Sequence, residues 1–250
     1  MWDRVELKSL AKQSLKGNYW QAFLISLVIA FATGNGRGAS NKVSEKIGEY
    51  VYGNPDIFII LGGLAILALA YRLLIGYSLE IGSRKYFINL AQFKNINGYY
   101  GFAFDRANYQ GIIFTMLLRD IFLFLWTLLL VIPGIVKGYS YRMVPYIIAE
   151  NPNIGAEQAI TLSRKMMDGH KADAFVLDLS FLGWYILGFI AFVVGTLFVN
   201  PYFDATDAQL YLALKKIALQ NQICSYEDFN MRREFNEFND FNDYYKGDDL

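Results

Sequence analysis

Four charged side chains lie inside long apolar stretches of the sequence: Arg72, Arg119, Asp120 and Asp178. Each such group costs about 2.5 to 3.5 kcal/mol at the centre of a membrane helix on insertion scales, so it needs a partner or water. Two chemistries fit. One is buried ion pairing, of Arg72 with Asp120 and of Arg119 with Asp178, and the other is a path for protons or a polar substrate. If residues 111–118 instead lie along the membrane interface, Arg119 and Asp120 sit at headgroup depth and neither applies.

The remaining reactive residues predict neither a catalytic nor a metal site. His170 is the one histidine and Cys224 the one cysteine, which excludes an intramolecular disulfide and the common zinc sites built from several such ligands. We expect His170 to contact a headgroup or to start a helix. The sequence contains no Gly-x-Ser-x-Gly, His-Glu-x-x-His or Walker motif. We therefore expect no enzymatic activity, no catalytic residue, no cofactor and no metal.

The elements that must position the four charges are long apolar runs. Residues 57–79 and 174–199 each suffice to cross the hydrocarbon core of a bilayer, about 30 Å thick, which takes about 20 residues of helix. Residues 111–132 are of similar length, and residues 19–33 form a shorter run. In lipid every backbone polar group must be bonded within its own segment, so such runs are helical. With 54% hydrophobic residues, the chain is predicted to be all-α, a polytopic helical membrane protein with four strong spans.

Other segments predict one or two re-entrant or interfacial helices. Residues 135–149 stay apolar after a break at Pro133 and fit a half-span or an interfacial helix. Residues 202–219 carry an apolar stripe that Lys215 and Lys216 interrupt, which favours the interface. Four spans with a cytoplasmic N-terminus would place the basic residues 134–173 outside, against the positive-inside rule. A fifth crossing removes that conflict but exports the acidic tail, so we favour five or six inserted helices over four.

The two ends of the chain differ in charge. The basic start places Leu7, Ala11 and Leu15 on one face, as in a helix lying on the membrane surface before a retained span. A cleaved signal peptide ending near Ala32 is the alternative. Residues 1–220 are predicted to form a single helical membrane domain, and residues 221–250 an acidic, disordered tail. The tail contains an acid-Phe-Asn repeat at residues 234–242, which either has no role or docks on a partner protein.

Two groups of motifs resemble a known family. The first is Leu7-Lys8-x-x-Ala11-Lys12-x-x-Leu15-Lys16-Gly17-x-Tyr19-Trp20. The second runs from Trp126-Thr127-Leu128-Leu129-Leu130-Val131-Ile132-Pro133-Gly134-Ile135-Val136-Lys137 through Tyr139-Ser140-Tyr141-Arg142-Met143, Glu150-Asn151-Pro152 and Ser163-Arg164-Lys165-Met166-Met167 to Pro201-Tyr202. In order and spacing they resemble the bacterial family catalogued as domain of unknown function 975, over residues 4–216. The resemblance implies a multi-pass protein of the bacterial plasma membrane and assigns no activity. A fainter likeness of residues 145–171, to membrane domains attached to some glycerophosphodiester phosphodiesterases, points to lipid.

Two classes of function follow from these features. The first is a non-enzymatic membrane protein with an envelope-organising, lipid-interacting or sensing role, whose partners are membrane lipids and not nucleic acid. The second is a small transporter or channel subunit, because transporter sites often lie at interrupted helices. The two are distinguished by whether the four intramembrane charges converge on a water-accessible cavity or face one another in a dry contact.

Overall fold

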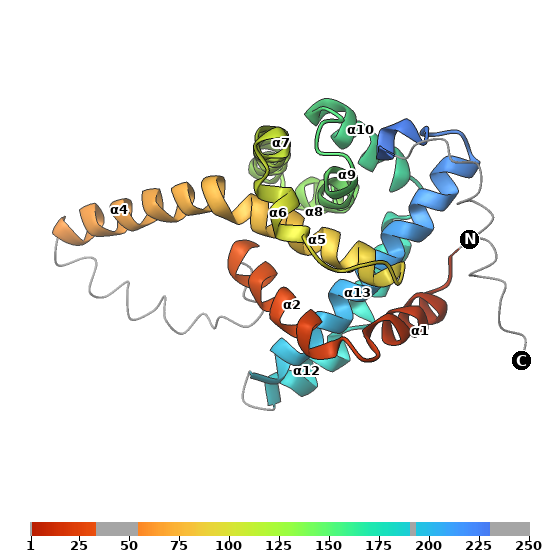
Figure 1. Cartoon of the computed structure of the whole chain (residues 1–250). Helices are drawn as coiled ribbons and strands as arrows, with labels where there is room; N and C mark the ends of the chain where they lie inside the picture. Colours follow the sequence, from red (N-terminus) through yellow and green to blue (C-terminus); the bar gives the residue numbers. More distant parts are fainter. Residues whose placement is uncertain (1, 34–54, 191–193, 231–250) are drawn as a thin grey trace, which may run out of the picture.

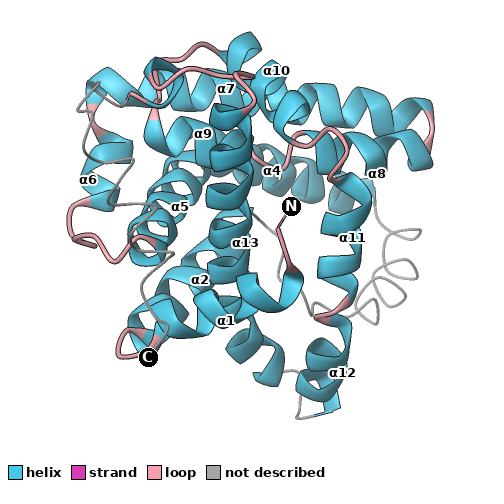
Figure 2. Cartoon of the chain, turned by 90° about the vertical axis from the view of Figure 1, so that its right-hand side faces the viewer, coloured by secondary structure: helices cyan, strands magenta, loops and turns pink. Residues whose placement is uncertain are grey.

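The computed structural model describes residues 2–33, 55–190 and 194–230, and every regular element within these ranges is a helix (Figures 1 and 2). The prediction of an all-α protein is confirmed. The acid-Phe-Asn repeat at residues 234–242 lies outside the described residues. The elements are α1 (Arg4–Leu15), α2 (Tyr19–Thr33), α4 (Pro55–Tyr71), the π-helical η1 (Arg72–Gly76), α5 (Tyr77–Ala91), α6 (Tyr99–Phe104), α7 (Arg106–Leu129), α8 (Val131–Ser140), α9 (Val144–Glu150), α10 (Ala156–Met166), α11 (Lys171–Leu179), α12 (Leu182–Ile190), α13 (Val194–Gln220) and the 3-10 turn η2 (Glu227–Phe229).

Helix α13 runs through the centre of the body, where α1, α2, α5 and α12 pack against it (Figure 2). The expectation that residues 202–219 form an interfacial helix is therefore wrong. The apolar stripe, which includes Leu210 and Leu214, is buried against protein. Lys215, which suggested the interface, is also buried, and its Nζ lies 2.6 Å from the carboxylate of Glu150. Its partner stands 65 residues earlier in the sequence, so the local pattern does not reveal it.

Helix α1 has the predicted apolar face, but protein covers this face where the sequence predicted a membrane surface. The Asp3 side chain accepts a hydrogen bond from the backbone N–H of Glu6 and so caps the start of the helix. Leu7, Ala11 and Leu15 are buried, as their helical spacing predicts. They pack toward α13, so protein, and not a membrane surface, covers this face.

Two helices are long and apolar enough to cross a bilayer within the described residues, where the sequence predicted four strong spans. The first is the continuous helix Ile59–Ala91, built from α4, η1 and α5, and the second is α7. Helix α2 has 15 residues, which is too short. The run at 174–199 is divided among α11, α12 and α13, with a turn at Ser180, so it is not one span. The residues of this run are apolar, as the prediction required, but the prediction missed the breaks between its helices.

Helix α4 extends away from the rest of the protein, whereas α5, which continues it, enters the body (Figure 1). The described side chains of α4 are exposed around its whole circumference, as Ile59 (76% exposed) and Ile66 (70%) illustrate. A helix at the core of a water-soluble protein would bury such residues. α4 therefore presents an apolar surface on every side.

Helices α7 and α8 form a hairpin with an apolar tip. α7 ends at Leu129, and Leu130 takes an extended backbone conformation before α8 begins at Val131. The chain thus breaks before Pro133, which lies in the first turn of α8, where a missing N–H costs little. A Cβ added to Gly134 would lie 2.6 Å from the Oγ1 atom of Thr127. Gly134 therefore permits the close approach of α8 to α7.

Candidate functional site

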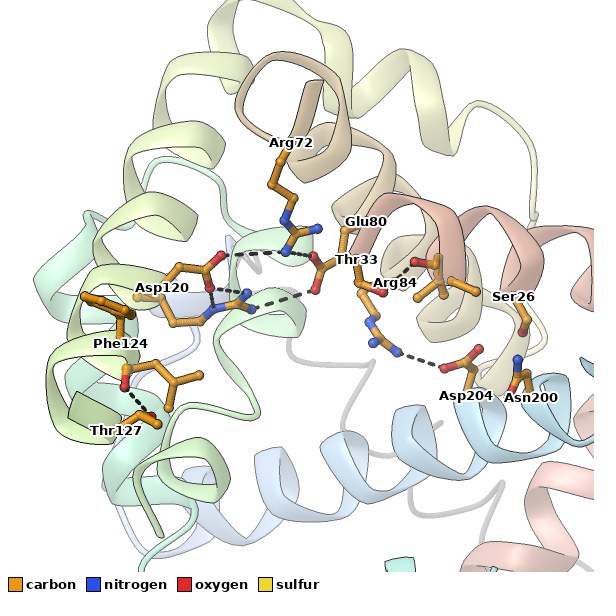
Figure 3. Close-up of a pocket in the computed structure, with 14 residues that line it drawn as sticks. Ser26, Thr33, Arg72, Glu80, Arg84, Asp120, Phe124, Thr127, Asn200 and Asp204 are labelled. Atoms are coloured by element: carbon orange, nitrogen blue, oxygen red, sulfur yellow. Dashed lines mark hydrogen bonds and ion pairs between the residues drawn. The ribbon is translucent and has the colours of Figure 1, made fainter. Parts of the chain in front are cut away.

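The two candidate spans are joined by a closed ring of four charged side chains, which we call the Arg72 ring: Arg72 and Glu80 on the first span, Arg119 and Asp120 on the second. Arg72 lies 2.9 Å from Glu80 and 3.7 Å from Asp120. Arg119 lies 2.6 Å from Asp120 and 3.8 Å from Glu80. Each guanidinium thus contacts both carboxylates (Figure 3). The ring has two positive and two negative groups, so its formal charge is zero.

The π-helical segment η1 places Arg72 on the same face as Glu80. Eight residues of regular α-helix would turn the two side chains about 80° apart, because each residue turns the chain by about 100°. A π-bulge accommodates one extra residue, which removes about 100° and leaves them roughly 20° apart. η1 begins at Arg72 and ends at Gly76. A Cβ on Gly76 would lie 3.0 Å from the backbone oxygen of Ala32, which is the oxygen that Arg72 Nη1 also contacts.

The ring lies beside a cavity of about 490 Å³ between α2, α5, α7 and α13. All four ring residues line it, together with Arg84 and Asp204, whose Nη1 and Oδ1 atoms are 3.2 Å apart. Ser26 and Asn200 lie at the Asp204 end, whereas Phe124 and Thr127 lie near Asp120 (Figure 3). Apolar side chains of α2 and α7 complete the lining: Ile29, Ala30, Leu123 and Phe124. The lining of the cavity is therefore partly charged and partly apolar.

Asp178 belongs to a second cluster, the Arg142 cluster, which consists of Arg142, Asp178, Asp207, Tyr139 and Tyr146. Arg142 Nη1 and Nη2 each donate to one carboxylate oxygen of Asp178, both at 2.8 Å. Arg142 Nε donates to Asp207 at 2.8 Å. Tyr139 also donates to Asp178, and Tyr146 to Asp207. Arg142 lies in the turn between α8 and α9, outside the candidate spans. Burial by itself would lower the pKa of its guanidinium, but Asp207 and Asp178 outweigh burial and raise that pKa.

Arg84 connects the cavity with the Arg142 cluster. Its Nη1 donates to the hydroxyl of Tyr146 at 3.0 Å and to Asp204 at 3.2 Å. The Tyr146 hydroxyl in turn donates to Asp207 at 3.2 Å. A continuous line of polar contacts therefore runs from Arg84 on α5 through Tyr146 on α9 to Asp207 on α13.

The structure brings together three of the four predicted site residues and separates the fourth. Arg72, Arg119 and Asp120 meet in the ring, and the expected approach of Arg72 to Asp120 is seen at 3.7 Å. The expected pairing of Arg119 with Asp178 is not formed, because Asp178 faces Arg142. The three residues therefore both pair with one another and line a cavity.

Sequence reasoning missed several members of both clusters. Neither Glu80 nor Arg142 was among the site residues expected from the sequence. Asp204 and Asp207 stand three residues apart, and the structure places both on the buried side of α13. That spacing, which repeats on one helix face, is a signal for paired buried carboxylates in need of arginine partners.

The other reactive residues stand apart from the cavity. His170 occupies the N-cap position of α11, in accord with the expected role at a helix start. Cys224 is a half-buried free thiol. Across residues 2–33, 55–190 and 194–230 no group of three His, Cys, Asp or Glu side chains is placed to hold a metal ion.

Comparison with known proteins finds a family model that part of the chain resembles. Residues 127–218 match the family model described as "Protein of unknown function (DUF975)". No curated protein and no solved structure matches the chain. The matched segment contains Arg142, Asp178, Asp204 and Asp207, whereas the Arg72 ring lies before it. Over residues 127–218 the chain is therefore similar to the DUF975 family, as the motifs of the sequence indicated.

Proposed function

We propose that this protein is a non-enzymatic, multi-pass protein of the bacterial plasma membrane that interacts with membrane lipid. The observation that carries the proposal is the exposed apolar surface of α4, whose described side chains have no protein cover on any side. Water around such a helix would be unfavourable, at about 25 cal/mol for each Å² of apolar surface. Lipid chains remove that cost.

The hairpin of α7 and α8 supplies a second lipid-facing surface. Its tip is a continuous exposed apolar segment that includes Leu128 (72% exposed) and Ile132 (75%). Lys137 of α8 lies over the ring of Trp126, with Nζ 4.5 Å from the ring centroid. This pairing of a cation with an indole is suited to the headgroup level of a bilayer. We infer that the hairpin tip enters the hydrocarbon and that Trp126 and Lys137 lie nearer its edge.

An organising, sensing or lipid-binding role agrees better with the charged clusters than catalysis does. The carboxylates of both clusters are paired with guanidinium groups that never lose their charge at physiological pH. Such pairs hold helices in register or bind polar groups, but they offer a reaction no ready proton donor or acceptor.

The membrane proposal is tested by cysteine labelling in opened membrane fragments, with Cys224→Ser as the background. Leu67→Cys, on α4, should react slowly with a water-soluble maleimide because lipid covers it. Asp168→Cys replaces a side chain that is 82% exposed and should react rapidly, as the matched control. Equal, rapid labelling of both positions, or release of the chain from membranes by alkali, would refute integral insertion.

A small transporter or channel subunit is the second candidate, and the cavity favours it. Charged residues of both candidate spans line a cavity that is large enough for a small solute, and the first span is interrupted by a π-helical segment at the same level. Proteoliposomes carrying an internal pH dye and an imposed potassium diffusion potential would test proton movement. The transporter candidate requires a flux that Glu80→Gln abolishes, and a flux equal to that of empty liposomes would exclude proton transport.

A further inference from the structure

The charges around the cavity balance one another. Three guanidinium groups line it, from Arg72, Arg84 and Arg119, and so do three carboxylates, from Glu80, Asp120 and Asp204. The three carboxylates would repel a ligand that carries only negative charge. The three arginines would repel a ligand that carries only positive charge. A ligand that carries one group of each sign meets neither penalty, because each end can face its opposite charge.

Unused donors indicate where the negative end of such a ligand would bind. Arg84 makes hydrogen bonds from Nη1, but its Nε has no partner within the described part of the chain. The same holds for Ser26 Oγ, although Ser26 is only 2% exposed. Buried donors without partners are rare in proteins and mark a missing acceptor. Both residues line the cavity wall, so an acceptor bound inside the cavity would lie near these donors.

The opposite end of the cavity suits a positive group. Asp120 is the most exposed carboxylate of the Arg72 ring, with 32% of its side chain accessible against 4% for Glu80. Phe124, on the same helix, lies beside Asp120 (Figure 3). An ammonium group there would face both a partly open carboxylate and an aromatic ring, and both attract cations.

We propose that this cavity binds a zwitterion, with its phosphate or carboxylate group at Arg84 and Ser26 and its ammonium group at Asp120. The inference rests on the lipid-interacting role proposed above and names the ligand class for it. A phosphatidylethanolamine headgroup has this chemistry, and so does free phosphoethanolamine. The apolar walls are formed by Ile29, Ala30 and Leu123 of α2 and α7, and the same two helices carry exposed apolar side chains such as Phe31 (70% exposed). Acyl chains can follow that surface while the headgroup occupies the cavity.

The test measures the melting temperature and the dissociation constant of the purified full chain in detergent with four probes. Phosphatidylethanolamine and phosphoethanolamine carry both charges, whereas phosphatidylglycerol and ethanolamine carry one each. We expect a zwitterion at about 100 times its dissociation constant to raise the melting temperature by about 5 °C, and the single-charge probes to leave it unchanged. Binding of the lipid alone assigns the site to a membrane lipid, and equal binding of phosphoethanolamine assigns it to a free solute.

Three variants separate binding from folding. Ser26→Ala removes an unpartnered hydroxyl, so the protein should fold normally and bind the zwitterion about fivefold more weakly. Asp120→Asn should weaken binding about tenfold. Asp168→Asn changes a residue outside the cavity lining and should leave binding unchanged. The proposal is overturned if phosphatidylglycerol binds as tightly as phosphatidylethanolamine, if neither zwitterion binds, or if Ser26→Ala and Asp120→Asn both bind like the parent. Loss of membrane insertion would refute the proposed function separately, because phosphoethanolamine still tests the cavity in solution.

Discussion

Arg142 donates two parallel hydrogen bonds, both 2.8 Å long, to the two carboxylate oxygens of Asp178. Such bidentate pairing is the strongest geometry available to an arginine and a carboxylate. The same guanidinium lies 2.6 Å from Asp207, so one side chain in the turn after α8 joins α11 to α13. All three residues fall within the segment that matches the family. The pairing therefore holds together helices of the segment that is similar to the DUF975 family.

Replacing Arg142 should destabilise the protein more than replacing Asp178. We expect Arg142→Gln to cost about 2–4 kcal/mol, because it leaves both Asp178 and the buried Asp207 without their guanidinium. Asp178→Asn should cost about 1–2 kcal/mol, since 27% of the Asp178 side chain is exposed and water can screen the loss. Chemical denaturation in detergent micelles gives both values.

A double-mutant cycle supplies the control for that prediction. Asp178→Asn and Arg142→Gln together should cost less than the sum of the single changes, by about 1–2 kcal/mol. Asp178→Asn combined with Arg119→Gln should be additive, because Asp178 pairs with Arg142 and Arg119 with Asp120. Coupling of Asp178 to Arg119 and not to Arg142 would contradict the arrangement.

Within the Arg72 ring, Glu80 should matter more for stability than Asp120. Glu80 is 4% exposed and accepts from Arg72, so Glu80→Gln leaves two guanidinium groups beside one carboxylate in a buried place. We expect a cost of about 2–3 kcal/mol for Glu80→Gln and about 1 kcal/mol for the more exposed Asp120→Asn. Melting curves of the two variants decide the order, and a larger loss for Asp120→Asn would mean that the ring is not the unit described.

The sequence predicted helical class and buried faces better than it predicted how helices are placed. Leu7, Ala11 and Leu15 are buried as their spacing required, because periodicity depends on neighbours along one helix. The same periodicity does not say whether lipid, water or protein covers that face. Lys215 and Lys216 favoured an interfacial position for residues 202–219, and the partner of Lys215, Glu150, lies 65 residues away in the sequence.

The sequence predicted only part of the candidate site, because it shows the charged residues but not their distant partners. Arg72, Arg119 and Asp120 stood out because charge inside an apolar run is costly wherever it occurs. Their partners were set by the extra residue of η1 and by the crossing of the two spans, neither of which composition records. The pairing of Asp178 with Arg142 was also not predictable from composition, because a turn after α8 brings together two residues that are 36 positions apart.

The packing of α8 on α7 should tolerate no side chain at Gly134. A Cβ there would lie 2.8 Å from Cα of Thr127, a backbone atom that cannot move without shifting the hairpin. We expect Gly134→Ala to lower stability by about 1–3 kcal/mol. Gly62→Ala is the matched control, because a Cβ at Gly62 meets nothing within 4 Å and alanine favours helix. Equal melting temperatures for the two variants would show that the hairpin is not closely packed.

Cys224 should be a poor nucleophile, and its pH profile should show why. Burial raises the pKa of its thiol from 9.0 to about 11, with the Asp228 carboxylate adding to the rise. At pH 8 the thiolate fraction should therefore be about 100-fold lower than in the unfolded chain, and alkylation by iodoacetamide correspondingly slower. The rate should climb about tenfold per pH unit and level off near pH 11. A slow rate that did not change with pH would instead indicate limited access of the reagent.

The raised pKa of the Cys224 thiol also determines how the free energy of unfolding changes with pH. Between pH 9 and pH 11 the unfolded thiol has lost its proton while the folded thiol keeps it, so the folded state binds more protons there. Stability then decreases as pH rises through this window and is unaffected by this group below it. Cys224→Ser removes the titrating group, so the variant should lose less stability between pH 9 and pH 11 than the parent does. Denaturation curves of both proteins at pH 8 and pH 10.5 measure the difference, and parallel losses would show that the thiol has the same pKa in the folded and unfolded states.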